Sequence, residues 1–82
     1  MRKSMPYKIE TMLMEIDIDG EDHHLEMMDG STWFVNPGDL PTVATWLPTS
    51  TVRIEEIDND SMFSFKITNI NVNISITAMK IK

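Results

Sequence analysis

The sequence predicts an all-β fold, a small barrel of five or six antiparallel strands with one short helical turn. Apolar and polar residues alternate over several short runs, which is the period of strands that bury one face. Turn-forming glycine, aspartate and asparagine residues separate these runs. Only residues 36–51 lack the alternation, so we expect the helical turn there, over one mouth of the barrel.

The first predicted strand lies around residues 12–18. Even positions there are apolar and odd positions are mostly acidic, with Leu13 as the exception. Residues 19–22 then predict a turn, because glycine accepts positive φ and aspartate bonds its own backbone. The residues expected to face the core are Met12, Met14, Ile16 and Ile18.

The next two strands form a predicted hairpin with tryptophan on its inner face. A two-residue loop of Asp29 and Gly30 would place Trp33 on the opposite face from Met27. A three-residue loop over residues 28–30 keeps both on one face, with Gly30 in the left-handed position of a bulged turn. We therefore predict the three-residue loop, which directs Phe34 outward or into a second layer.

Residues 36–51 are the predicted helical segment. Asp39 is expected to cap it, Pro41 lies near its start, where a missing N–H costs little, and Pro48 ends it. The apolar residues at helical spacing are Val43, Trp46 and Leu47.

The second half of the chain predicts a strand over residues 52–57 and a final hairpin. The alternation slips at residues 55–56, which predicts a bulge there. In the hairpin, a turn around residues 69–70 would pair Ile67 with Val72. The same register would pair Phe65 with Ile74, and Phe63 with Ile76.

A set of turn and core residues runs through the chain: DGSTWFV at 29–35, Asp39, residues 46–47, 52–54 and 65–69. This set resembles small bacterial domains with the pattern DGS-x-W-x-V, then an Asp, a Trp and V-x-I. The resemblance covers about residues 23–72 and implies a small SH3-like β-barrel. Its motifs are turn and core signatures rather than catalytic ones, and that family is largely uncharacterised. Relatives tend to have Gly-Asp after the tryptophan, where this chain has Pro-Thr-Ser at 48–50.

Composition bounds the class of protein. We expect a flexible leader over residues 1–7 and a single small β-barrel domain over residues 8–82. Without cysteine, neither a disulfide framework nor a thiolate zinc site is possible. The formal net charge of −6 disfavours nucleic acid as a partner. No apolar run is long enough for a signal peptide or a membrane span, so we expect a cytoplasmic protein that does not contact membranes.

Ligand-type side chains gather only at residues 17–24, where acidic residues precede His23 and His24. Neighbouring residues of a strand face opposite ways, so these histidines are poorly placed to hold one metal ion together. We expect a solvated acidic hairpin and no metal site, with a divalent-metal-responsive hairpin as the alternative. No nucleophile motif such as G-x-S-x-G is present, so we expect neither catalytic residues nor a cofactor.

The function that the sequence favours is a non-catalytic protein-interaction module, a monomer or weak homo-oligomer with an unknown protein partner. A nucleic-acid-binding barrel is the third hypothesis. We expect Trp33 and Trp46 to be core residues rather than a platform for a ligand. Met28, Met62 and Met79 fall off the core phase and could form an adaptable apolar surface. The candidate binding residues are Phe34, Met28 and Trp46.

The last strand, over residues 72–80, lies mostly within an uncharged run, residues 67–79. If its outer edge is open, a partner strand or a second copy can add there by backbone hydrogen bonds. The alternative is that it pairs with the first strand and closes the barrel.

Overall fold

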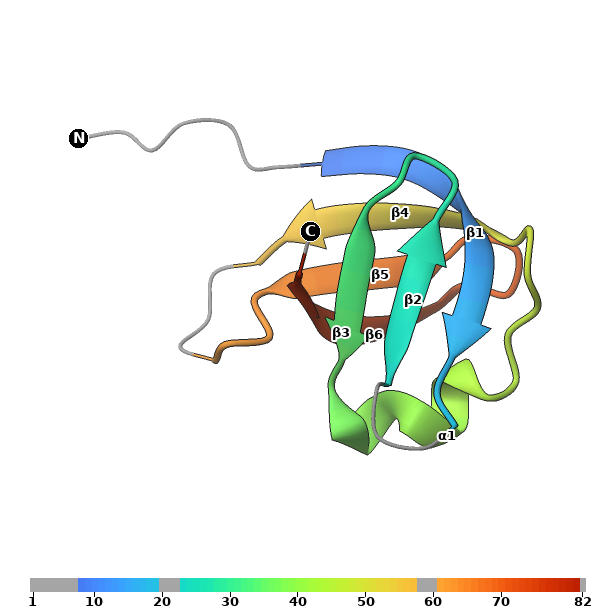
Figure 1. Ribbon diagram of the computed structural model, residues 1–82. Helices are drawn as coiled ribbons and strands as arrows, with labels where there is room; N and C mark the ends of the chain where they lie inside the picture. The colour runs from blue at the N-terminus through green and yellow to red at the C-terminus, as the bar shows by residue number, and fades with distance from the viewer. Residues whose placement is uncertain (1–7, 20–22, 58–60, 82) are drawn as a thin grey trace.

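The computed structural model describes residues 8–19, 23–57 and 61–81, in which antiparallel strands close into a barrel in the order β1-β2-β3-β6-β5-β4 (Figure 1). The predicted leader, residues 1–7, lies outside the described residues. A 3₁₀ turn, η1 (Pro37–Asp39), continues into a short helix, α1 (Leu40–Val43), at one end of the barrel. The small all-β barrel with one short helical segment is therefore confirmed. The strands are β1 (Lys8–Asp17), β2 (His24–Met27), β3 (Thr32–Val35), β4 (Thr51–Glu56), β5 (Phe65–Asn69) and β6 (Ile74–Lys80).

The barrel interior is a hydrophobic core built around Trp33. This side chain is fully buried, and its ring meets Phe65 edge to face at 5.0 Å between centroids. The Lys80 side chain lies over the face of the Trp33 ring, with its Nζ 5.1 Å from the ring centroid. All six strands and the helical segment contribute to the core, through Leu13, Leu25, Met27, Trp33, Val35, Val43, Trp46, Val52, Ile54, Ile67, Ile76 and Ala78.

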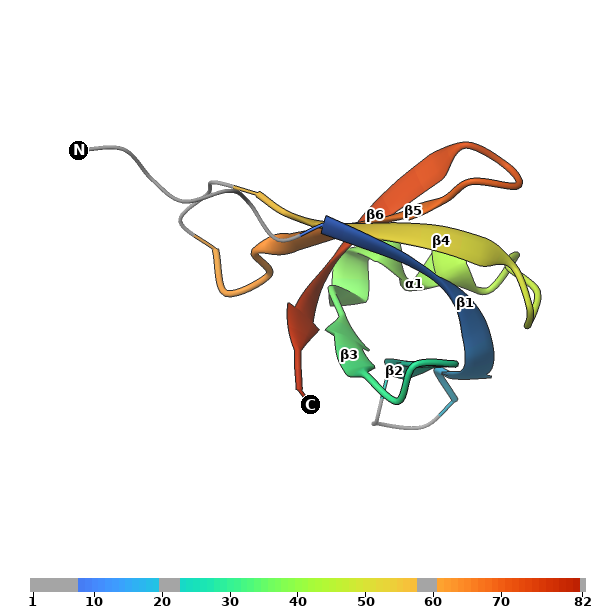
Figure 2. The same ribbon diagram turned by 90° about the horizontal axis from the view of Figure 1, so that it is seen from above.

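β1 contains a bulge at Met14. Leu13 pairs with Met27, whereas Glu15 pairs with Glu26, so Met14 is an extra residue without a partner on β2. A bulge of this kind bends the strand and increases its twist. β1 pairs with β4 before the bulge and with β2 from Leu13 onward, so the bend turns the strand around a corner of the barrel (Figure 2).

The bulge corrects the predicted inner face of β1. Leu13, the apparent exception to the alternation, is fully buried, while Met12 and Met14 are exposed. After the extra residue the phase reverses, and Ile16 and Ile18 pack against the core as expected. The prediction was wrong for the two methionines because one unpaired residue shifts a period-two pattern to the other face.

The β2–β3 hairpin has the predicted three-residue loop. Leu25 pairs with Trp33, and the Met27 N–H donates to the Ser31 carbonyl (2.9 Å). Gly30 has φ +91°, the left-handed conformation that favours glycine at this position of the turn.

The β5–β6 hairpin has a different register from the predicted one. Ile67 pairs with Ile76 rather than with Val72, and Asn69 pairs with Ile74. Residues 70–73 form the turn, which ends at Asn73 with φ 60°. Both registers place odd residues of β5 opposite even residues of β6, so the alternation alone does not distinguish them. Figure 2 shows that the hairpin extends beyond the ring of strands, which leaves its tip exposed.

β4 lacks the predicted bulge. Its pairing with β5 runs without a shift from Val52 opposite Asn69 to Glu56 opposite Phe65. Ile57, which suggested the slip, lies after the end of the strand, where its N–H donates to the Ser64 carbonyl (2.8 Å). The phase therefore changes because the strand ends, and not because a residue is inserted.

β6 is not a free edge strand. It pairs with β5 along one side and with β3 along the other, through Ala78–Lys80. The open-edge prediction is therefore wrong, and so is the predicted pairing with the first strand, because β1 lies between β2 and β4. Closure removes the edge that the uncharged strand would otherwise expose.

Asp39 has a different role from the predicted helix cap. Within the described residues, its side chain makes no cap bond to α1. Its Oδ2 accepts hydrogen bonds from the Thr77 N–H (2.9 Å) and from the Thr77 hydroxyl (3.2 Å). Asn36 caps η1 by accepting from the Gly38 N–H (3.1 Å) and also donates to the Thr77 hydroxyl (3.0 Å). Since β3 ends at Val35, these side chains satisfy the part of β6 that β3 does not reach.

Candidate functional site

The three residues predicted to bind a partner lie in three different surroundings. Phe34 is on the outer face of β3, Met28 is in the β2–β3 turn, and Trp46 follows the helical segment. Each of them has its own set of neighbours, and the structure does not bring them into one site.

Phe34 points outward, as the first of its two alternatives predicts. Its ring stacks on Phe63 at 6.0 Å between centroids and with 18° between planes. The His23 ring lies on it as well, at 6.2 Å. The three rings form a half-buried aromatic cluster on the outside of the barrel.

Met28 belongs to an exposed methionine surface on β1 and the adjacent turn. It is 55% exposed, and its N–H donates to the Met12 carbonyl (2.8 Å). Met12 and Met14 are exposed because of the bulge. Flexible thioether side chains suit adaptable contacts, but none of the described residues that line the hollow beside them, between β1, Met28 and Thr51, is a buried polar residue that could orient a ligand.

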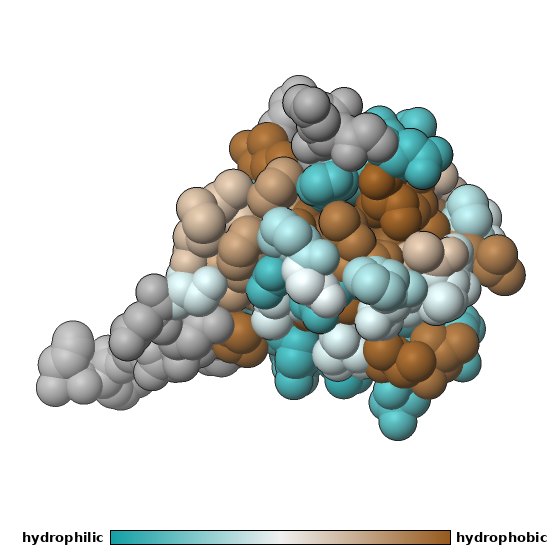
Figure 3. Space-filling view, turned by 90° about the horizontal axis from the view of Figure 1, so that it is seen from below, coloured by the Kyte–Doolittle hydropathy of each residue, from teal (hydrophilic) through white to brown (hydrophobic). Residues whose placement is uncertain are grey.

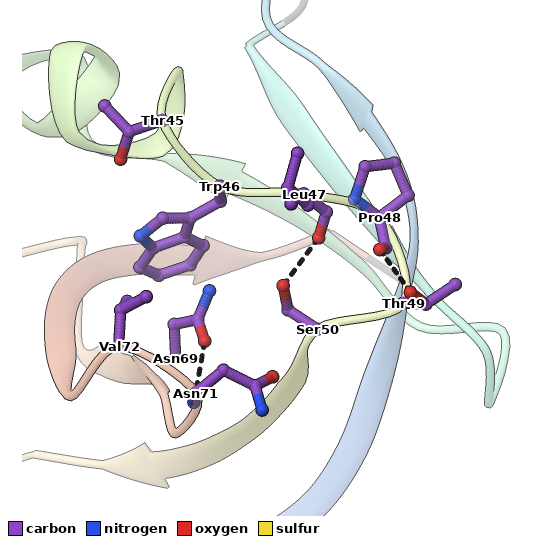
Figure 4. Close-up of a pocket in the computed structure, with 9 residues that line it drawn as sticks. All are labelled: Thr45, Trp46, Leu47, Pro48, Thr49, Ser50, Asn69, Asn71 and Val72. Atoms are coloured by element: carbon purple, nitrogen blue, oxygen red, sulfur yellow. Dashed lines mark hydrogen bonds between the residues drawn. The ribbon is translucent and has the colours of Figure 1, made fainter.

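Trp46 is only 5% exposed, which confirms that it is part of the core. The edge of its ring also forms the wall of a pocket of about 370 Å³ (Figure 4). Two loops that are distant in the sequence make this pocket, which we call the Trp46 pocket. Its lining residues are Thr45, Trp46, Leu47, Pro48, Thr49, Ser50, Asn69, Asn71 and Val72.

The loop of residues 45–50 is held in place by β1. The Thr49 N–H donates to the Leu13 carbonyl (2.8 Å), and the Leu13 N–H donates to the Ser50 carbonyl (2.9 Å). Thr49 has φ 71°, an uncommon conformation for a β-branched residue, and it turns the chain back toward β4. The first wall of the pocket is thus attached to the most buried part of β1.

The β5–β6 turn supplies the other wall, and two asparagine side chains organise it. Asn69 Oδ1 accepts from the Asn71 N–H (3.0 Å), and Asn71 Oδ1 accepts from the Thr51 N–H (2.8 Å). Each oxygen is identified by the backbone N–H that it meets, so each amide nitrogen faces the other way. Figure 4 shows the Asn69 nitrogen directed toward the space between Trp46 and Ser50.

The Trp46 pocket differs from the Phe34 cluster and the methionine surface because two of its hydrogen-bond donors have no acceptor among the described residues. Asn69 is 1% exposed, and in the described part of the chain its Nδ2 donates to no acceptor. The Trp46 Nε1 is also buried without a partner among the described residues. Of these two donors, the Trp46 Nε1 is the fully buried one, and a buried donor without an acceptor costs about 1–3 kcal/mol.

The rim of the pocket includes two exposed aliphatic side chains, and none of the described lining residues carries a charge. Leu47 is 71% exposed and Val72 is 52% exposed. Figure 3, which views the helix end of the barrel, shows hydrophobic areas there that are separated by hydrophilic ones. An uncharged lining is notable in a chain whose formal net charge is −6.

The DGS-x-W segment has a structural explanation. The Trp33 Nε1–H donates to Ser31 Oγ (2.9 Å), and Ser31 Oγ donates to Asp29 Oδ1 (2.7 Å). The Ser31 N–H donates to the same oxygen (3.0 Å). The chain of bonds connects the exposed turn to the buried indole, so this Asp–Ser pair orients Trp33.

The bond from the Ser31 hydroxyl, with the Ser31 N–H and the Lys80 charge, holds the pKa of Asp29 below its ordinary value. A lowered folded-state pKa means that the carboxylate stabilises the fold above the unfolded pKa of about 3.9. That contribution is lost as the pH falls through the lower folded pKa. We expect Asp29→Asn to melt below wild type near neutral pH and together with it at about pH 2. Thermal unfolding followed by circular dichroism across this range checks this, and a gap that persists at low pH would contradict it.

The predicted acidic hairpin places its two histidines apart. His24 Nε2 lies 3.9 Å from Asp17 Oδ2, whereas the His23 ring contacts Phe34. Among the described residues, no group of three or more metal-ligating side chains is arranged to hold an ion, and residues 21–22 lie outside them. Neither helical segment in the described ranges is long and apolar enough to cross a membrane.

Sequence reasoning identified Trp46 but missed the residues that complete its pocket. Asn69 was assigned to a turn, and Leu47 and Val72 were assigned to apolar faces. The remaining signal was the uncharged composition of both loops, which the sequence shows without indicating that they meet. The chain matches no protein-family model, no curated protein and no solved structure. The resemblance to small bacterial domains therefore stays a prediction.

Proposed function

We propose that this barrel is a non-catalytic protein-interaction module and that the Trp46 pocket is its binding site. The observation that carries the proposal is the pocket itself, a hollow whose described lining residues are uncharged, with the unpaired buried Trp46 Nε1, the unpaired Asn69 Nδ2 and exposed apolar side chains at its rim. Concave, mostly apolar sites with a few placed polar groups are typical of ligand recognition.

The arrangement of the rim supports a macromolecular partner. Leu47 and Val72 come from different loops and stand on opposite sides of the hollow (Figure 4). A partner that covers both side chains removes their apolar surface from water. This burial stabilises the complex by roughly 25 cal/mol for each Å² that is covered. Because both loops are tied to the barrel by backbone hydrogen bonds, little conformational entropy is lost when they are covered.

The distribution of cations supports a protein rather than a nucleic acid as the partner. Arg53 and Lys66 both lie near the Glu55 carboxylate, at 3.4 Å and 3.9 Å from Oε1. These side chains are partly neutralised within the sheet, and no cationic residue of the described ranges lines the pocket. Nucleic-acid binding depends on clustered Lys and Arg that are available to phosphates.

Site-specific photo-crosslinking in the organism of origin tests the proposal. Benzoylphenylalanine placed at Leu47 or at Val72 is expected to crosslink a defined protein, because both positions are exposed beside the pocket. The same probe at Glu56, an exposed residue of β4, is the matched control and should give no such product. Probes at Met28 and Phe34 test the two other surfaces. Crosslinks confined to those positions, or equal at all of them, would contradict the proposal.

A further inference from the structure

We infer that the Trp46 pocket binds an uncharged, extended peptide segment. In the complex, a backbone carbonyl of the peptide accepts a hydrogen bond from Asn69 Nδ2. An aliphatic side chain next to that carbonyl lies against Trp46, Leu47 and Val72. The inference rests on the proposed function and names the chemistry of its ligand.

The first step is the donor that the fold leaves unused. Asn69 is almost completely buried, and its Oδ1 is occupied by the Asn71 N–H. Its orientation is therefore fixed, and the amide nitrogen toward the pocket can only donate. The complementary group is a neutral or anionic oxygen acceptor.

The second step excludes an anion. Among the described residues, no lysine, arginine or histidine lines the pocket, and the protein carries a formal net charge of −6. A carboxylate or phosphate in this hollow would lose hydration without a cation to replace it. A carbonyl oxygen of an amide fits the donor at a much lower desolvation cost.

The third step concerns the surroundings of that donor. The Trp46 ring and the Val72 side chain lie on one side of Asn69, with Leu47 and Ser50 across the hollow (Figure 4). The volume of about 370 Å³ is near the lower end for small-ligand pockets, roughly 300–1,000 Å³. An extended peptide presents a carbonyl and an apolar side chain within this span, and its neighbouring residues can continue over the exposed rim.

Asn69→Asp is the sharpest variant for testing the donor. The carboxylate keeps an oxygen for the Asn71 N–H but replaces the amide donor with an acceptor. Asn71→Asp is the matched control, because it adds the same charge to the pocket lining and keeps an oxygen for the Thr51 N–H. Circular dichroism and thermal unfolding establish that both variants are folded.

The probes are peptides selected from a phage-displayed random library on the wild-type domain, with Leu47→Ser protein as the counter-selection. We expect the selected peptides to share an aliphatic residue flanked by uncharged residues. Asn69→Asp should weaken their binding about tenfold or more, measured by fluorescence anisotropy, and Asn71→Asp by less than about threefold. A consensus with an obligatory charge, equal losses in both variants, or no peptide that prefers wild type to Leu47→Ser would overturn the inference.

A measurement on the wild-type domain keeps the test decisive if Asn69→Asp does not fold. The Asn69 side-chain amide resonances of ¹⁵N-labelled protein should shift when a selected peptide is added, and unchanged resonances at saturation would overturn the inference. The two proposals fail differently. The comparison uses the crosslink from the probe at Val72. If Leu47→Ser abolishes that crosslink while Asn69→Asp preserves it, the proposal of an interaction module stands and the inference of a carbonyl-binding peptide site does not.

Discussion

Replacement of Trp33 by alanine is expected to unfold the domain or nearly so. The side chain is fully buried, packs edge to face on Phe65 and donates to the Ser31 hydroxyl. Truncation of a buried tryptophan costs about 3–5 kcal/mol. The total free energy of unfolding that the core of such a small domain supplies is about as large. Circular dichroism and urea unfolding measure the loss directly.

Trp33→Phe separates the volume of the ring from its hydrogen bond. Phenylalanine fills much of the same space but leaves the Ser31 hydroxyl without the indole donor, so this variant should fold with a smaller loss of stability. A Trp33→Ala protein with the wild-type melting temperature would mean that Trp33 is not a core residue, and would contradict the structure.

Asp39→Ala is expected to lower the free energy of unfolding by about 1–3 kcal/mol, because two half-buried donors of Thr77 lose their charged acceptor. The carboxylate accepts from both the N–H and the hydroxyl of Thr77, at the point on β6 that β3 does not reach. Without this carboxylate, the Thr77 N–H of β6 has lost its acceptor. Chemical denaturation measures the change in stability.

Asp39→Asn is the matched control, because it retains an oxygen acceptor and should lose less than the alanine variant. Amide hydrogen exchange adds a local readout, since the Thr77 amide should exchange faster in Asp39→Ala than in wild type. If Asp39→Ala keeps both wild-type stability and slow exchange at Thr77, Asp39 does not close the edge of β6.

The β2–β3 hairpin was predictable in detail because its two possible loops had different consequences. A loop one residue shorter would have moved Trp33 to the outer face, so the need to bury a tryptophan selected the register. Gly30 at positive φ was part of the same argument. Local chemistry and burial favoured the same answer, and the structure agrees with it.

The β5–β6 hairpin shows where this reasoning ends. A pattern of period two is satisfied equally by any even shift, so Ile67 could face Val72 or Ile76 without changing which residues point inward. The long turn ending at Asn73 decides between them, and it depends on hydrogen bonds with Thr51 that no local signal encodes. Likewise, the irregularity at Leu13 was visible in the sequence, but only the pairing of β1 with two different strands shows that Met14 is the inserted residue.

By itself, the sequence determined the fold class, the position of the helical segment and the burial of both tryptophans, because each depends on the local alternation of apolar residues and on turn chemistry. Tertiary structure alone decided the Trp46 pocket, in which the loop of residues 45–50 and the β5–β6 turn lie side by side. It also decided that Asp39 completes β6 rather than caps α1. The physical reason is that closure of the barrel brings together groups that lie far apart in the sequence, so that Asp39 accepts from the Thr77 N–H and Asn71 accepts from the Thr51 N–H.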